Sequence, residues 1–299
     1  MEKEIRFLDP SIERKGLLLE EHLSSFKQEQ APMFSLLEFN LSGLCNRQCV
    51  FCPRVDPDAF PNRNIHMPVG MYEGVLADLE KAGFDGTIIY SAFSEPLLYK
   101  DLDKVICLAR ERCPKVRTEL VTNGDLLTLD RLKELFRSGL TMLAVSMYDG
   151  PHQMDHFKAL KEKAGLSDAQ MILRVRWLSV EEHFGITLSN RAGSVTIKEA
   201  RIGALSSPAR QACHYPFYQI LIDYDGAVLL CAHDWGRRLI VGNVNDESTL
   251  SIWNNAAMKK VRVSLIKEDR GFRPCDRCDV HGVLIGRNYF EKWTEYYEK

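Results

Sequence analysis

Apolar and polar residues alternate along the chain in a pattern that predicts repeated strand–helix units. From residue 34 onward, short apolar segments bounded by turn residues alternate with longer segments that have helical spacing. Strands that alternate with helices in this way favour a parallel sheet. The predicted strands are 34–41, 86–90, 117–122, 142–147, 171–177 and 186–188. The predicted helices between them are 71–82, 102–112, 129–138 and 152–163.

These units predict an α/β fold built as a partial (β/α)6 TIM-like barrel, followed by a smaller C-terminal region. In the smaller region, residues 218–223 alternate between apolar and polar side chains, and Asp225-Gly226 supplies the turn of a β-hairpin. A predicted helix follows and ends near residue 267. The predicted divisions are an N-terminal extension (1–33), a partial barrel (34–205), a hairpin-plus-helix domain (206–285) and a C-terminal aromatic helix (286–299).

The N-terminal extension carries an imperfect amphipathic stripe. Its apolar positions are Ile12, Leu17, Leu18, Leu19, Leu23 and Phe26, with His22 among them. A stripe of this kind predicts a helix that packs against one end of the barrel.

Composition narrows the classes of function. The 299 residues are 45% hydrophobic and 27% charged, with a formal net charge of -2. A chain so close to neutral is not expected to have the strong positive electrostatic field that attracts nucleic acid or an anionic membrane. Neither a signal peptide nor an apolar run long enough for a bilayer is recognised, so we expect a cytoplasmic protein. There, the nine cysteines are expected to be metal ligands or free thiols.

Three cysteines lie in one short loop directly after the first predicted strand. Cys45, Cys49 and Cys52 have the spacing C-x3-C-x2-C, with Phe51 just before the last. Thiolates are the usual ligands of iron–sulfur clusters, whereas a structural zinc requires a fourth ligand. The spacing therefore predicts a [4Fe–4S] cluster with three protein ligands and one open iron.

Four more cysteines fall in the C-terminal third of the chain. Cys213 and Cys231 flank the predicted hairpin, and Cys275 and Cys278 form a C-x2-C pair. Four thiolates of this kind predict either a structural zinc ribbon or a second iron–sulfur cluster.

Polar motifs follow the other predicted strands, where a parallel barrel carries its ligand-binding loops. They are Ser94-Glu95-Pro96, Thr122-Asn123-Gly124, Ser146 with Asp149-Gly150, Arg174 with Arg176, and Asn190-Arg191. Taken alone, the first two are ordinary turn sequences.

The triad and these loops together resemble the radical SAM superfamily, whose members cleave S-adenosylmethionine (SAM) at the open iron. The resemblance implies SAM contacts at Phe51, Ser94, Glu95, Asn123, Ser146 and Arg176, with Asn190 at the entrance of the site. Ser94 departs from the family, which usually has glycine before this glutamate. Tyr90, Asp149, His214 and Arg176 have the chemistry of a base, but the sequence assigns none of them that role.

The C-terminal cysteines resemble the first part of the SPASM domain. No cysteine follows Cys278, so the region is similar to the shortened twitch form, with one auxiliary cluster. The resemblance thus implies two [4Fe–4S] clusters and SAM. It also implies a radical SAM oxidoreductase in which a 5′-deoxyadenosyl radical abstracts hydrogen from the substrate and the auxiliary cluster accepts an electron.

The leading hypothesis is oxidation of a hydroxyl to a ketone on a small polyol, either a sugar or an aminocyclitol, including nucleotide-linked forms. The resemblance also implies an electron donor such as flavodoxin or ferredoxin. The alternatives are a peptide- or protein-modifying maturase, a sugar epimerase that uses Cys107 or Cys113 as thiol donor, and a zinc-binding scaffold without enzymatic activity.

Overall fold

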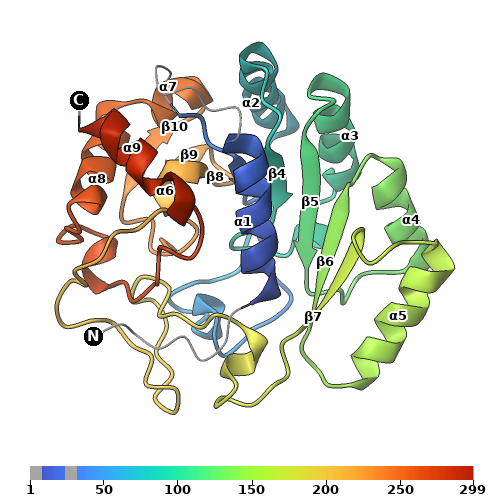
Figure 1. Ribbon diagram of the computed structural model, residues 1–299. Coiled ribbons are helices and arrows are strands. Elements are labelled where there is room, and N and C mark those ends of the chain that lie inside the picture. The colour runs from blue at the N-terminus through green and yellow to red at the C-terminus, as the bar shows by residue number, and fades with distance from the viewer. Residues whose placement is uncertain (1–8, 24–31, 299) are drawn as a thin grey trace.

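The computed structural model describes residues 9–23 and 32–298 of the chain, and its centre is a mostly parallel sheet (Figure 1). The strand order is β10-β9-β8-β1-β4-β5-β6-β7. The five parallel barrel strands are β1 (Leu36–Phe39), β4 (Thr87–Tyr90), β5 (Arg117–Thr122), β6 (Met142–Met147) and β7 (Met171–Val175). The predicted α/β fold is therefore confirmed.

Strand β8 (Gln219–Ile222) pairs in parallel with the free edge of β1, opposite β4. Strands β9 (Ala227–Leu229) and β10 (Ile240–Asn243) then continue the sheet in antiparallel order. The predicted hairpin forms, and it extends the barrel sheet. The C-terminal region and the barrel consequently share β1 as a common strand.

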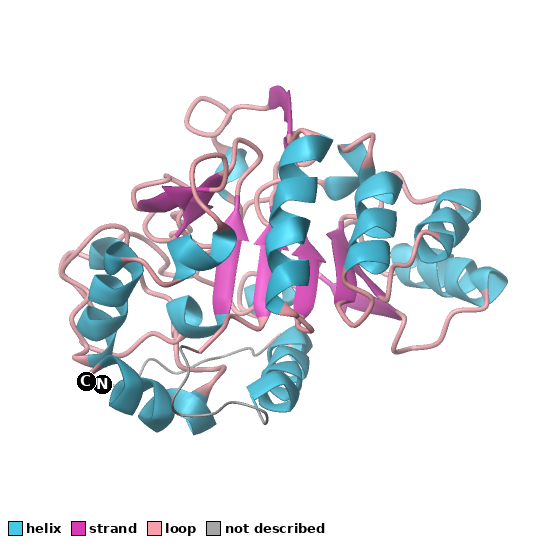
Figure 2. Ribbon diagram, turned by 90° about the horizontal axis from the view of Figure 1, so that it is seen from above, coloured by secondary structure: helices cyan, strands magenta, loops and turns pink. Residues whose placement is uncertain are grey.

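Four helices cover the outer face of the parallel strands (Figures 1 and 2). They are α2 (Val69–Ala82), α3 (Leu102–Arg112), α4 (Leu129–Arg137) and α5 (His152–Ala164). The Thr128 hydroxyl accepts a hydrogen bond from the Arg131 amide and so caps α4 at its start. Helix α2 ends where Gly83 adopts the left-handed conformation, as its sequence predicts.

The remaining elements lie around the C-terminal half of the sheet (Figure 1). Helices α6 (Tyr215–Tyr218), α7 (Thr249–Trp253), α8 (Ala256–Ile266) and α9 (Phe290–Tyr297) form this layer. The buried Arg262 guanidinium donates to the carbonyls of Pro216 and Trp253 and lies 3.9 Å from the Trp253 ring centroid. A short antiparallel pair, β2 (Ser42–Gly43) and β3 (Arg63–His66), forms within the loops that follow β1.

The predicted sixth barrel strand at residues 186–188 is wrong, because this segment is an irregular loop. Just before it, Phe184 and Gly185 have φ values of 55° and 71° and turn the chain sharply away from β7. Ile186 and Leu188 are buried in a small apolar cluster with Phe51. The apolar run thus reflects burial beneath the cysteine-triad loop.

Helix α1 (Pro10–Leu23) lies on the face of the sheet opposite α2–α5 (Figures 1 and 2). The two terminal nitrogens of Arg14 donate to the two carboxylate oxygens of Glu119 on β5, at 2.5 and 2.7 Å. Leu19 is fully buried and Leu17 is 62% exposed, so the predicted apolar stripe is only partly correct. Phe26 lies outside the described residues.

The Arg14–Glu119 pair gives a test of how α1 is held. Arg14→Met removes the close partner of a buried carboxylate and leaves it, among the described residues, with Arg117 at 3.7 Å. Breaking one side of a buried ion pair costs about 3 kcal/mol. Urea denaturation of Arg14→Met should therefore show a loss of this size.

Glu13→Gln, at an exposed position on the same helix, is the matched control and should leave stability unchanged. Equal stability of Arg14→Met and wild type would contradict a stabilising role for this contact.

Candidate active site

A cavity of about 390 Å³ lies over the inner face of the barrel strands. Alternate residues along each strand point to one face of a sheet, and the lining follows this period. The strand residues that follow this period are Glu38 on β1, Ile89 on β4, Glu119 and Val121 on β5, Ala144 and Ser146 on β6, Ile172 and Arg174 on β7, and Gln219 on β8; Thr122, the last residue of β5, also lines the cavity. The neighbouring residue Phe39 instead packs on Tyr72 of α2.

The cysteine triad lines this cavity from the loop after β1. Burial raises the pKa of all three thiols, and burial together with the neighbouring thiols raises that of Cys49 to about 12. No disulfide joins them. Cys52 raises the pKa of Cys45, and both raise that of Cys49, so the three thiols lie close together. Such a group fits the ligand set of a cluster, since bound iron stabilises the thiolate form.

Two polar side chains fix the backbone around the triad. The Asn62 side chain accepts from the Cys45 amide and donates to the Cys45 carbonyl, both at 2.9 Å. Arg54 is buried and donates to the carbonyls of Phe93 and Gly43. Its positive charge lowers the pKa of Cys45 and Cys52, against the larger effect of burial, and so favours the thiolates.

Arg47, within the triad loop, links that loop to the ends of two barrel strands. It pairs with Asp125 after β5 and with Asp149 after β6, each at 2.5 Å. Its guanidinium also lies 4.9 Å from the centroid of the Tyr148 ring. Since these partners lie 78 and 102 residues further along the chain, the triad loop is fixed only once the barrel has formed.

Five predicted SAM-binding residues lie together along the cavity: Phe51, Ser94, Glu95, Asn123 and Ser146. Glu95 accepts from the Thr122 hydroxyl at 2.6 Å and from the Asn123 amide at 2.8 Å, which ties its loop to the end of β5. Burial raises the pKa of Glu95, and these hydrogen bonds favour its ionised form. A carboxylate that is fixed beside the cavity in this way could bind the amino group of SAM.

Serine at position 94 introduces no backbone strain. The left-handed residue of this loop is Ala92, with φ of 71°, whereas Ser94 is not left-handed. The buried Ser94 hydroxyl, which lines the cavity, has no hydrogen-bond partner among the described residues. Since buried polar atoms are nearly always satisfied, this hydroxyl fits contact with a bound ligand.

The two arginines of the fifth predicted strand have different partners. Arg174 donates to the Ser146 hydroxyl at 2.7 Å, and its buried Nε has no partner among the described residues. Arg176 is ion-paired with Asp9, at the start of α1. Both line the cavity, and the unpartnered Nε of Arg174 fits contact with a bound ligand.

Asn190 does not line the cavity. It is fully buried, and its side chain bonds to the backbone at Gly193, Gly203, Arg277 and Asp279. These bonds connect the loop after β7 to the C-x2-C pair. The structure therefore gives Asn190 a role in holding two loops together.

The four C-terminal cysteines converge from three segments of the chain. Cys213, Cys231 and Cys278 each raise the pKa of Cys275, in addition to the effect of burial. A Cβ at Gly282 would overlap the Cys213 sulfur, so the chain approaches this thiol as closely as glycine allows.

The surroundings of the four thiols fit a four-iron cluster. Buried Arg270 donates to the carbonyls of Gln211, Ala212 and Val280, and its charge lowers the pKa of Cys275 against burial. The fixed positive charge of Arg270 favours the group of thiolates that would hold a cluster.

Three of the four residues considered as bases lie away from the cavity. The Tyr90 hydroxyl bonds to the Tyr72 hydroxyl at 2.7 Å on the outer face of the sheet. Asp149 is paired with Arg47, and the His214 ring bonds to the Ile285 carbonyl. Only Arg176 lines the cavity.

Several residues of the site were not identified from the sequence. Asp9, Ser11 and Arg14 reach the cavity from α1, while Arg54 and Arg270 lie beside the cysteines. Glu38, whose carboxylate accepts from Ser91 at 2.8 Å and Gln219 at 2.5 Å, was overlooked in an apolar run. A glutamate inside a buried strand was the one available signal, because buried charges need partners.

A partial barrel with three thiols at its strand ends and four more at its C-terminal hairpin defines a radical SAM enzyme with an auxiliary iron–sulfur domain. Family models agree with this assignment. The radical SAM superfamily model matches residues 39–167, and the model of SPASM, an iron–sulfur cluster-binding domain, matches residues 213–279. Together the two matches span the barrel and the C-terminal region and indicate an enzyme that requires SAM and iron–sulfur clusters.

The individual relatives include a small-molecule dehydrogenase. The chain is 27% identical over 259 residues to the S-adenosyl-L-methionine-dependent 2-deoxy-scyllo-inosamine dehydrogenase of Niallia circulans, covering 86% of this chain and 97% of that protein. The crystal structure of BtrN in complex with AdoMet and 2-DOIA is similar, with a TM-score of 0.71 and 25% identity over 87% of this chain and 99% of that one. The structure of anSMEcpe with bound AdoMet, at 15% identity, has a TM-score of 0.56 over 89% and 93% of the two chains, and shares the fold.

Iron content tests the two predicted clusters. After anaerobic reconstitution, the chain should hold about eight iron and eight sulfide, four of each per cluster. Cys231→Ala should lower both to about half, because it removes one of four ligands from the C-terminal site. Zinc bound at that site in place of iron would contradict the auxiliary cluster.

The Arg47 contacts predict a role in retaining the first cluster. Arg47→Gln removes both ion pairs, so a chelator should extract iron from the triad several-fold faster, about the effect of losing 1 kcal/mol. Absorbance of the reconstituted cluster reports the rate.

Arg112→Gln breaks an exposed ion pair with Glu80 on the outer helices and is the matched control. Equal extraction rates from the two variants would mean that the Arg47 contacts do not retain the cluster.

Proposed function

We propose that this enzyme oxidises one hydroxyl group of a small polyol, a sugar or an aminocyclitol, to a ketone. The main observation in support of this proposal is a single cavity that reaches both cysteine groups. Cys45, Cys49 and Cys52 line it on one side, and Ala232 and His233, next to Cys231, line it on another. A substrate bound between them would have a radical source and an electron acceptor within one cavity.

The polar lining between the two cysteine groups suits hydroxyl and amino groups. Glu38 supplies acceptor oxygens, Ser91 and Gln219 hold it in place, and Arg174 supplies a donor. A ring with several hydroxyls can satisfy such groups, and a few oriented polar contacts fix which carbon faces the radical source.

The reaction balances as the loss of one hydrogen from the alcohol carbon and one from its hydroxyl group. SAM and a cluster held by Cys45, Cys49 and Cys52 would supply a 5′-deoxyadenosyl radical that removes one hydrogen atom from the carbon. A cluster held by the four C-terminal cysteines would accept the remaining electron. The hydroxyl proton leaves to a base or solvent, so alcohol becomes ketone and 5′-deoxyadenosine carries the hydrogen. The chain's own part is to orient the ring and to exclude water from the cavity.

The two cysteines outside the predicted clusters favour oxidation over epimerisation. An epimerase needs a thiol that returns a hydrogen atom to the substrate carbon. Cys107 lies on α3, and buried Cys113 follows that helix on the outer side, with its thiol near the Leu76 carbonyl. Neither lines the cavity.

The cellular setting follows from the proposed chemistry. Cysteine ligands and low-potential clusters need a reducing compartment, which favours the cytoplasm and a donor such as flavodoxin or ferredoxin. Among the described helices, each is too short or too polar to pass through a bilayer.

Product analysis with and without the auxiliary site tests the proposal. With SAM, a reductant and 2-deoxy-scyllo-inosamine, the wild-type enzyme should form ketone and 5′-deoxyadenosine in about equal amounts, because one radical oxidises one substrate molecule. Cys231→Ala should still cleave SAM and lose at least about nine-tenths of ketone formation. Cys107→Ala is the control and should behave as wild type.

Two outcomes would contradict the proposal. Solvent deuterium in a product that is still an alcohol would indicate epimerisation, and ketone formation by Cys231→Ala at the wild-type rate would remove the electron-acceptor role.

A further inference from the structure

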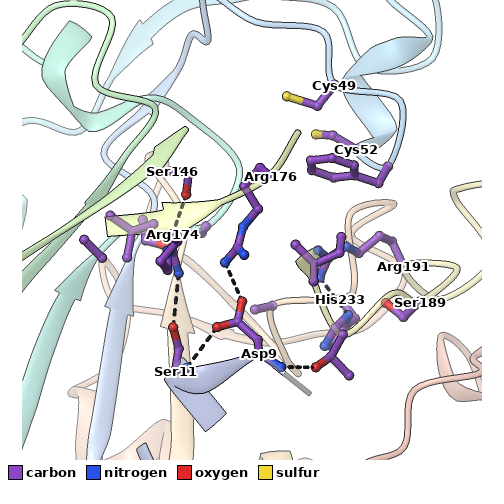
Figure 3. Close-up of a pocket in the computed structure, with 18 of the residues that line it drawn as sticks. Asp9, Ser11, Cys49, Cys52, Ser146, Arg174, Arg176, Ser189, Arg191 and His233 are labelled. Atoms are coloured by element: carbon purple, nitrogen blue, oxygen red, sulfur yellow. Dashed lines mark hydrogen bonds and ion pairs between the residues drawn. The ribbon is translucent and has the colours of Figure 1, made fainter. Parts of the chain in front are cut away.

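Helix α1 forms part of the cavity wall, although it precedes every barrel strand in the sequence. Asp9, Ser11, Ile12, Arg14 and Lys15 all line the cavity from its first two turns. Figure 3 shows Asp9 directed toward Arg176, just after β7, and Ser11 toward Arg174 of β7, on the same cavity as Cys49 and Cys52. The helix therefore places charged groups where a substrate would lie.

Asp9 is held in position by three contacts at the start of α1. Its carboxylate pairs with a terminal nitrogen of Arg176. Its other oxygen accepts from the Ser11 amide at 2.9 Å, which caps the helix. Its own amide donates to the Thr187 hydroxyl at 2.9 Å, in the loop after β7. The acid is thus fixed between the helix and the barrel.

The ion pair is buried, with side-chain exposures of 13% for Asp9 and 6% for Arg176. Burial alone would raise the pKa of Asp9, but the charges of Arg176 and Arg174 bring it below the usual value. Asp9 is consequently an anion at neutral pH. Arg176 otherwise donates only to the carbonyls of Val175 and Gly185, so among the described residues Asp9 is its one carboxylate partner.

A guanidinium in a ligand cavity is the preferred site for a carboxylate or phosphate group. Here that site already holds an anion from the chain itself. A second anion at Arg176 would have to displace Asp9 or share the cation with it, and two buried anions repel each other strongly.

We propose that Asp9 is a specificity-determining residue that occupies Arg176 as an internal carboxylate, so that the cavity accepts neutral or amino-bearing polyols and rejects acidic or phosphorylated ones. This inference rests on the proposed function for the class of substrate. It goes further by stating that acidic and phosphorylated polyols are excluded, and that a residue at the start of α1 excludes them.

The test compares two six-membered-ring probes that differ in charge, myo-inositol and D-glucuronate. Calorimetry on the reconstituted enzyme with SAM bound measures their affinities without turnover. Asp9→Asn is the main variant, because asparagine has the same shape and also caps helices. It should bind glucuronate about tenfold or more tightly than wild type, the effect of one hydrogen bond to a charged group, and leave inositol affinity within about twofold.

Three further variants separate charge from structure. Asp9→Ser is neutral and also caps helices, so it should repeat the gain if Asp9→Asn folds poorly. Asp9→Glu retains the anion and should keep glucuronate excluded. Glu13→Gln removes an exposed negative charge one turn along the same helix and should have no effect.

Glucuronate binding that is equally weak in wild type and both neutral variants would overturn the proposal, as would an equal gain in Glu13→Gln. A gain in SAM affinity without a gain for glucuronate would also overturn it, because Asp9 would then compete with the SAM carboxylate. Failure of the proposed function is distinguishable, since it would appear as no ketone from 2-deoxy-scyllo-inosamine while the binding difference persisted.

Discussion

The pairing of β1 along both of its edges is the constraint on which the rest of the site depends. Leu36–Phe39 pair with Thr87–Tyr90 on one side and with Gln219–Ile222 on the other. The loop with the cysteine triad leaves the end of this strand, and the hairpin before Cys231 begins beside it. One fully paired strand therefore sets the position of both cysteine groups relative to the cavity, although they are more than 150 residues apart.

Charge balance around buried thiols is the second common feature of the two cysteine groups. Arg54 beside the triad and Arg270 beside the C-terminal group are each bonded to backbone carbonyls. Carbonyl partners hold a guanidinium in place without cancelling its charge, which stays available to the thiolates. An aspartate or glutamate partner would fix the same arginine and weaken this effect.

Most of the fold could be predicted because its signals are local. The strands 117–122 and 142–147 and the helix 102–112 were predicted to the residue, since period, caps and turn residues lie within each segment. The segment 186–188 failed because an apolar run reports burial and not conformation, and here the burial comes from Phe51 in a distant loop. The cysteine ligand sets were recognisable for the same local reason, through their spacing. By contrast, the contacts of Asp9, Arg14 and Asn190 depend on residues 87 to 167 positions away, and no sequence period encodes such pairs.

Helix α1 also bears on the order in which the molecule is assembled. It precedes the barrel strands in the sequence, and Glu119 and Arg176, the partners of Arg14 and Asp9, follow 105 and 167 residues later. Contacts between residues so distant in sequence form late, because the chain between them must first be ordered. The barrel is thus built with its inner face uncovered, and α1 closes that face in one of the last steps of folding.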